Sequence, residues 1–148
     1  LRGYRRCRGL TMEFEITGAP VGKRRPRFST INGFAQAIKV DADVEYENLV
    51  RLMFRLNKPT DYDLFDKPVR VRIEAHFPIP KSFSKKRAEE AAAGAIHPQK
   101  KPDADNIAKI ICDALNNIAY GDDTQVIELT VVKKYAREPK VKVSISAY

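Results

Sequence analysis

The sequence predicts an α+β fold, in which one domain packs a mixed or mostly antiparallel β-sheet against two to three helices. Several segments alternate apolar and polar residues, as half-buried strands do, and other segments have helical periodicity. The two kinds of segment do not follow one another in the regular alternation of a doubly wound fold. With 148 residues, the chain suits a single domain with one hydrophobic core.

In the first half of the chain, turn and capping signals separate the expected elements. The dipeptide Asn32-Gly33 between two strand-like segments is a strong hairpin signal. Asp41 or Asp43 can cap the helix that follows. We therefore expect a strand over residues 12–17, a hairpin of strands 27–31 and 34–40, and a helix from about 41 to 56.

In the second half, Pro78 and Pro80 end a clearly alternating segment, and Ser84 and Gly94 can cap the two ends of a short helix. These signals predict a strand over residues 69–77, helices over 85–93 and about 104–117, and strands over 124–135 and 140–147. We expect the last two strands to pair antiparallel around the turn at 137–139.

The first eleven residues differ from the rest of the chain. They begin without Met, are rich in Arg and precede Met12, where the strand pattern begins. We therefore expect residues 1–11 to be a disordered leader, either vector-derived or upstream sequence, and residues 12–148 to form the domain.

The chain carries a net charge of +8, which suggests a polyanionic partner, nucleic acid before a membrane surface. We expect no membrane association, because no apolar run is long enough to span a bilayer and no basic amphipathic helix is visible. Cys7 and Cys112 stand far apart in dissimilar contexts, which favours a reducing compartment without disulfides. Motifs for nucleotide binding, serine hydrolysis and zinc binding are missing from the sequence, so we expect no small-molecule substrate.

This basic chain gathers carboxylates in the segment from residue 100 to residue 125. Like charges repel, so the cluster costs stability unless something offsets it. The usual offset is a divalent metal ion with oxygen ligands, and its usual purpose is phosphate chemistry. The carboxylates belong to Asp103, Asp105, Asp113, Asp122 and Asp123.

Helical periodicity gives the segment from residue 104 an apolar stripe and an opposite face that bears Asp105, Lys109 and Asp113. If the following strand runs beside the start of this helix, Asp123 can meet Asp103 and Asp105. Three carboxylates suit Mg²⁺, or Mn²⁺ in its place, and Lys109 can hold a phosphate or stabilise a leaving oxygen. We do not expect Asp113 to be a metal ligand; a structural hydrogen bond suits it as well.

Each of these residues also has a purely structural interpretation. Asp103 can cap the helix, and Asp105 can interact with the positive end of its dipole. Lys109 can pair with Asp105 or Asp113 at helical spacing. For any one residue the structural reading is the default, and only the combination indicates a metal site.

The order K-P-D-A-D-N-x-x-K, D-A-L-N and D-D-x-Q over residues 100–125 resembles the signature of the RusA family of Holliday junction resolvases. The run of residues 20–27, P-V-G-K-R-R-P-R, is similar to the phage-type members. The resemblance covers most of Met12–Tyr148. It implies a homodimeric endodeoxyribonuclease that uses Mg²⁺ or Mn²⁺ to cut two opposed strands of a four-way DNA junction. It also implies a bacterial, cytoplasmic protein encoded by a prophage.

Carried onto this sequence, the resemblance gives catalytic roles to four residues. Asp103, Asp105 and Asp123 match the essential carboxylates, which hold the metal, and Lys109 matches the essential lysine. Asp122 matches an acidic neighbour whose role stays open. The chain has Asn116-Asn117 where Asn-Gly is common, a departure that affects a turn rather than the catalytic set.

Basic residues on both sides of the acidic segment are candidates for DNA-phosphate contacts, although a solvated charged loop is the alternative. The candidates are Lys23, Arg24, Arg25, Arg27, Lys100 and Lys101. Two other functions stay open. One is a junction-binding protein without catalysis, and the other is a metal nuclease that acts on other branched DNA.

Overall fold

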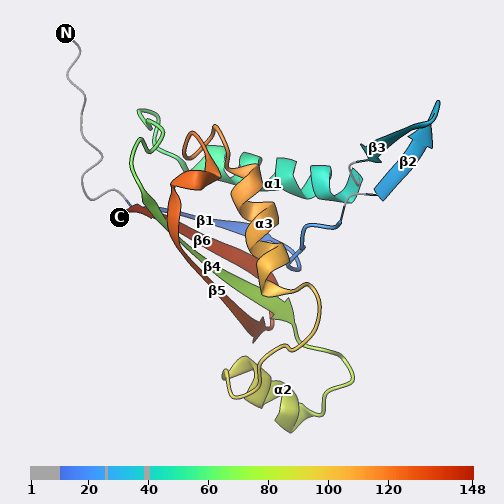
Figure 1. Ribbon diagram of the computed structural model, residues 1–148. Coiled ribbons are helices and arrows are strands. Elements are labelled where there is room, and N and C mark those ends of the chain that lie inside the picture. The colour runs from blue at the N-terminus through green and yellow to red at the C-terminus, as the bar shows by residue number, and fades with distance from the viewer. Residues whose placement is uncertain (1–10, 26, 39–40) are drawn as a thin grey trace.

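The computed structural model describes residues 11–25, 27–38 and 41–148, and confirms the predicted α+β fold (Figure 1). Residues 1–10 of the expected leader lie outside the described residues, whereas Thr11 already belongs to the first strand. The described elements are β1 (Thr11–Thr17), β2 (Arg27–Ile31), β3 (Phe34–Ile38), α1 (Asp41–Asn57), β4 (Val69–Pro78), α2 (Lys85–Ala92), α3 (Ala104–Ala114), the short 3₁₀ helix η1 (Asp123–Gln125), β5 (Val126–Ala136) and β6 (Lys140–Ala147).

The main sheet is mixed and has the strand order β1-β6-β4-β5. Strand β6 is antiparallel to both β1 and β4, whereas β4 and β5 are parallel. The prediction that β5 and β6 pair with each other is therefore wrong, because β4 lies between them. The inward residues of β6 are fully or almost fully buried, and those of edge strand β5 only partly, so burial favours β6 in the centre.

One face of the sheet packs against α1 and α3 and forms the hydrophobic core (Figure 1). Val71 and Ile73 of β4 are completely buried there, as are Phe54 of α1 and Ile110 of α3. Burying each such side chain contributes about 1.5–3 kcal/mol. Because this packing uses the apolar stripe of α3, the polar face of that helix is turned away from the sheet.

The helix boundaries follow the sequence signals with two exceptions. Ser84 caps α2 by accepting a hydrogen bond from the Arg87 amide, as predicted. Asp43 is not an exposed cap of α1; it is buried, and its carboxylate accepts a hydrogen bond from the Arg24 amide at 2.9 Å. Helix α3 ends at Ala114 rather than near residue 117, and Asn117 has a φ of 59°, which is incompatible with continued helix.

Two parts project from the two-layer body. Helix α2 lies beyond the ends of β4 and β5, and the β2–β3 hairpin extends from the start of α1 (Figure 1). The hairpin confirms the Asn32-Gly33 turn signal, although residues 39 and 40 of its expected second strand are outside the described part of the chain. Among the helices that the structure describes, none has the length and apolar character needed to cross a bilayer.

Candidate active site

The start of α3 presents two exposed carboxylates. Asp103 occupies the N-cap position with an extended backbone, yet its side chain makes no capping hydrogen bond. Asp105 lies in the first helical turn. Among the described residues neither forms a salt bridge, so capping does not account for Asp103 and both carboxylates remain accessible to a ligand from solvent.

One turn beyond Asp105, the Lys109 side chain is 59% exposed, and its Nζ lies 3.1 Å from Oδ1 of Asp113. The sequence left Asp105 and Asp113 open as partners, and the structure selects Asp113. The Asp113 side chain is only 20% exposed, so this ion pair is anchored on a partly buried carboxylate. It fixes the ammonium group along the polar face of the helix.

The Asp-Asp-x-Gln motif builds the turn that presents Asp123. Asp122 caps η1 by accepting a hydrogen bond from the Thr124 amide. The side-chain oxygen of Gln125 accepts hydrogen bonds from the amides of Gly121 and Asp122, at 2.8 and 3.0 Å. Its amide nitrogen donates to the Phe65 and Lys67 carbonyls, which anchors the turn to the chain before β4. Asp122 therefore has a structural role that the sequence left open.

Charged groups of α3 act on the carboxylate of Asp123. A hydrogen bond with Asp122, burial and the Asp122 charge raise the pKa of Asp123, while Lys109 lowers it and Asp113 raises it. The same hydrogen bond lowers the pKa of Asp122. The charges of Lys109 and Asp113 thus act on Asp123. Asp103 and Asp105 lie at the start of the helix, and neither is among the main causes of this shift.

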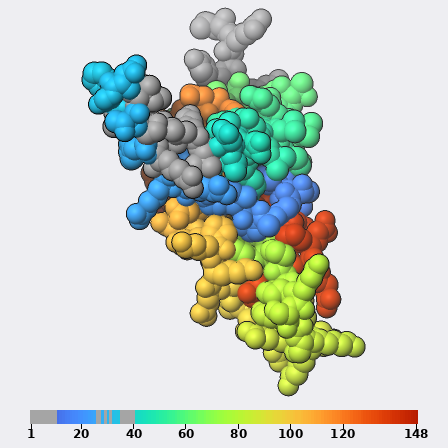
Figure 2. Space-filling model, turned by 90° about the vertical axis from the view of Figure 1, so that its right-hand side faces the viewer, coloured from blue at the N-terminus to red at the C-terminus, as the bar shows by residue number. Residues whose placement is uncertain are grey.

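The loop before β2 packs against the start of α3 (Figure 2). A Cβ atom on Gly22 would lie 2.7 Å from Cβ of Pro102 and 3.0 Å from Cβ of Asn106, so only glycine permits this contact. The Lys23 amide donates a hydrogen bond of 2.9 Å to the Asn106 carbonyl. Between the two segments lies a groove of 720 Å³, lined by residues 20–25, 101–103 and 106.

This groove joins predicted DNA contacts to a predicted catalytic residue, because Arg24, Arg25 and Lys101 line it together with Asp103. All three cations are exposed, and Lys100 beside them is exposed as well. The Arg27 side chain is outside the described part of the structure.

Lys23 differs from the other cations because it points inward. Its ammonium contacts Glu47 of α1 and lies 3.5 Å from Asp113. The sequence interpretation did not include Glu47. A signal was present, because Asp43, Glu47 and Val50 share one helical face, and an acid on a buried face requires a cation.

Within the described residues, no three His, Cys, Asp or Glu side chains are close enough to hold a metal ion by themselves. That Asp103, Asp105 and Asp123 share one cation therefore stays a prediction. The donor set nevertheless fits a hard divalent cation, since every candidate ligand is a carboxylate. Positive charge would also relieve the repulsion between Asp122 and Asp123.

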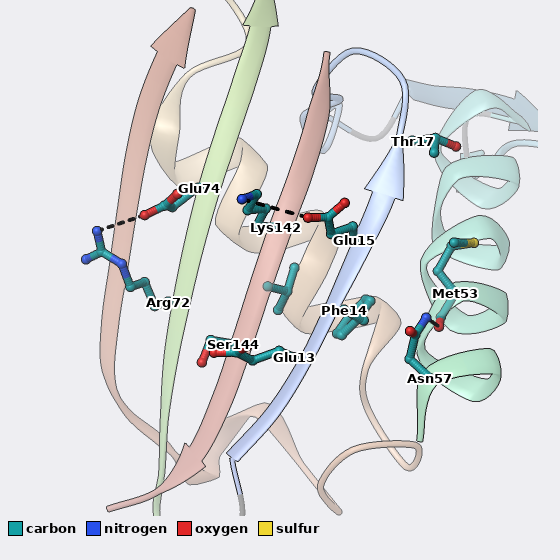
Figure 3. A pocket seen from close by; sticks show the side chains of 11 residues that line it. Glu13, Phe14, Glu15, Thr17, Met53, Asn57, Arg72, Glu74, Lys142 and Ser144 are labelled. Atoms are coloured by element: carbon teal, nitrogen blue, oxygen red, sulfur yellow. Dashed lines mark hydrogen bonds and ion pairs between the residues drawn. The ribbon is translucent and has the colours of Figure 1, made fainter. Parts of the chain in front are cut away.

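A second groove, of 660 Å³, is lined by residues of β1, β6, β4 and α1 (Figure 3). Four of its five charged residues are paired, Arg72 with Glu74 at 3.2 Å and Lys142 with Glu15 at 3.8 Å, and the fifth is Glu13. Because these charges neutralise one another, the groove is a poor candidate for a polyanion or a metal ion.

Unpaired carboxylates beside exposed cations are typical of sites that act on phosphodiesters. The family described as "Endodeoxyribonuclease RusA" matches residues 17–146. The chain therefore belongs to the RusA family, whose activity is endonucleolytic cleavage of DNA at Holliday junctions. It is also 37% identical over 136 residues to "Uncharacterized protein YqaN" of Bacillus subtilis (strain 168), a match that covers 90% of this chain and 94% of the relative.

Proposed function

We propose that the protein is a Mg²⁺-dependent endodeoxyribonuclease that resolves four-way DNA junctions by paired, symmetric hydrolysis of phosphodiesters. Mn²⁺ is expected to substitute. The observation that carries the proposal is the groove in which Arg24, Arg25 and Lys101 lie with Asp103. Cations there can hold a DNA backbone while the carboxylate faces the same strand.

In this proposal Asp103, Asp105 and Asp123 hold the divalent cation. When bound, the cation supplies a Lewis acid that activates water and offsets negative charge on the phosphodiester. Lys109 donates hydrogen bonds to the phosphate or the leaving oxygen, where charge develops during cleavage. Asp122 and Gln125 act indirectly by holding the turn that presents Asp123.

The proposed DNA path runs from the basic loop across the start of α3 towards α2. Figure 2 shows these segments following one another along one face of the molecule. Besides Arg24, Arg25, Lys100 and Lys101, the path includes Lys85, Lys86 and Arg87 in the first turn of α2. Cations at a helix N-terminus oppose its dipole, so their position favours an anionic partner over a stabilising role.

We further propose that the protein acts as a homodimer in bacterial cytoplasm and is encoded by a prophage. A four-way junction has two equivalent scissile phosphates, and a two-fold symmetric dimer provides two equivalent sites. The bacterial relative supports the bacterial part of this proposal.

The test compares wild type with Asp103→Asn on a four-way junction in Mg²⁺. The variant should lose cleavage while retaining binding, because removing a negative charge does not weaken attraction to DNA. Glu128→Gln is the control; it breaks the Arg70–Glu128 pair, whose atoms are 2.9 Å apart, on the opposite face of the sheet.

Three results would lead to other conclusions. Binding without cleavage by wild type at millimolar Mg²⁺ or Mn²⁺ would indicate the non-catalytic binding protein. Cleavage of flaps or forks but not of junctions would indicate a nuclease for other branched DNA. Full activity of Asp103→Asn would remove that carboxylate from catalysis.

A further inference from the structure

We infer that Asp113, backed by Lys23 and Glu47, is a positioning residue that holds the Lys109 ammonium group at the cleavage site. This inference rests on the proposed function, because it requires Lys109 to take part in the reaction. It also reassigns Lys23, which the sequence placed among the DNA contacts. Lys23 lines the groove but is only 29% exposed, and it acts through its ion pairs.

The geometry consists of consecutive ion pairs between two helices and a loop. Oδ1 of Asp113 lies 3.1 Å from Nζ of Lys109, and Oδ2 lies 3.5 Å from Nζ of Lys23. Each oxygen of the carboxylate therefore serves a different lysine. The Lys23 ammonium also contacts Glu47 of α1, so it bridges the two acids.

The far end of this chain of ion pairs is anchored in α1. Glu47 is 8% exposed and also pairs with Arg51, at 3.5 Å. The Nε of Arg51 donates a hydrogen bond of 3.0 Å to the Ala114 carbonyl at the end of α3. Helix α1 is thus joined to the end of α3 in two ways, directly through Arg51 and, one turn earlier in α1, through Glu47, which Lys23 connects to Asp113.

Lys109 needs such support because its own environment restrains it little. Its side chain is 59% exposed, compared with 29% for Lys23 and 20% for Asp113. A lysine ammonium on a flexible stem samples many rotamers unless a partner restricts it. Asp113 keeps the ammonium on the side of α3 where its charge acts on Asp123.

The support from Lys23 does not depend on pH in the range in which nucleases work. Burial by itself lowers the pKa of Lys23, but the hydrogen bonds and charges of Glu47 and Asp113 outweigh it and raise the pKa above its usual value. Lys23 therefore remains charged at every pH at which a nuclease works.

A double-mutant cycle tests the inference. We expect Asp113→Asn to slow single-turnover cleavage of a four-way junction by about 10–100-fold, the range for a misplaced catalytic group. Junction binding in EDTA and the unfolding midpoint should stay near wild type. In a Lys109→Ala background the same substitution should have almost no further effect, because its effect passes through Lys109.

A second measurement does not require activity. The ion pair with Asp113 restricts the rotamers of Lys109, so Asp113→Asn should lower the NMR order parameter of the Lys109 side chain. This readout carries the test if cleavage by Lys109→Ala falls below detection. If Asp113→Asn does not fold, Asp113→Ala, which removes the carboxylate outright, replaces it in both experiments.

Lys23→Gln separates positioning from DNA contact. We expect slower cleavage and a lower order parameter for the Lys109 side chain, with an unchanged salt dependence of junction binding. A reduced salt dependence with a wild-type order parameter for the Lys109 side chain would return Lys23 to the DNA contacts. Glu128→Gln again serves as the control, since Glu128 pairs with Arg70 and with none of Lys23, Glu47, Lys109 and Asp113.

The outcomes separate failure of this inference from failure of the proposed function. Wild-type cleavage by Asp113→Asn, or an equal loss with and without Lys109, would overturn the inference alone. Wild-type cleavage by Lys109→Ala would overturn the catalytic role of that lysine, and the inference with it.

Discussion

Gly22→Ala provides the sharpest test of how the basic loop meets the acidic helix. The added Cβ would lie 2.7 Å from Cβ of Pro102 and 3.0 Å from Cβ of Asn106. Both atoms are close to the main chain, one in a proline ring and the other on α3, so neither moves easily. The loop itself must therefore withdraw.

The size of the effect follows from these contacts. Ordinary van der Waals contact begins near 3.4 Å, so the loop must shift by at least about 0.7 Å. Overpacking of this kind costs about 1–3 kcal/mol of unfolding free energy. The shift also strains the 2.9 Å hydrogen bond from the Lys23 amide to the Asn106 carbonyl, a bond worth about 1 kcal/mol.

The effect on cleavage should exceed the effect on stability. The loop carries Arg24 and Arg25 to the groove that contains Asp103. A displacement near 1 Å in a reacting complex can slow a reaction about 100-fold, so we expect cleavage to fall by about 10–100-fold. Urea unfolding measures the loss of stability, and single-turnover cleavage of a four-way junction measures the loss of cleavage rate.

Ile145→Val is the matched control. Ile145 is completely buried in β6, and its truncation costs about 0.5–1.5 kcal/mol without touching the groove. We expect this control to lose stability and keep its cleavage rate. If Gly22→Ala retains both wild-type stability and wild-type cleavage, the close packing of the loop on α3 is refuted.

Three further predictions concern charge. Replacing Arg24 and Arg25 by Gln should reduce the slope of log binding constant against log salt by about 2, and an unchanged slope would remove both from the DNA path. Replacing Lys85 and Lys86 by Gln should weaken junction binding. It should also raise the unfolding free energy by about 0.3–1 kcal/mol per residue at low salt, because these cations oppose the α2 dipole. Unchanged binding would exclude α2 from the DNA path. Burial raises the pKa of the Cys112 thiol to about 11. At pH 8 its alkylation, followed by mass spectrometry, should therefore be more than about 100-fold slower than that of an ordinary cysteine, and the rate should rise with pH through about 11. Rapid alkylation at pH 8 would contradict this prediction.

Local signals in the sequence predicted the elements well. The alternation in β4, the Asn32-Gly33 turn and the Ser84 cap all depend on residues close in sequence, and all are found in the structure. The pairing of β5 with β6 was predicted wrongly. Strand order depends on contacts between distant segments, and neither strand contains a local signal that β4 lies between them.

In the candidate site, too, contacts between residues close in sequence were predicted, and contacts between distant segments were not. Helical periodicity placed Lys109 and Asp113 on one face of α3, and the structure confirms that they pair there. It did not predict that Lys23 would turn inward to Glu47, because that contact joins a loop to a helix 24 residues away. Nor did it predict that Gly22 sets the spacing between loop and helix, since the contact is with residues 102 and 106.

By itself the sequence determined the family, the secondary structure and the residue types available for chemistry, because these depend on composition and on short-range periodicity. Only the tertiary structure decided which charges neutralise one another and which remain exposed in the groove. The physical reason is that the sequence fixes the number of charges, whereas their partners are set by packing between segments far apart in the chain. Asp103 remains exposed and Lys23 becomes partly buried through that packing alone.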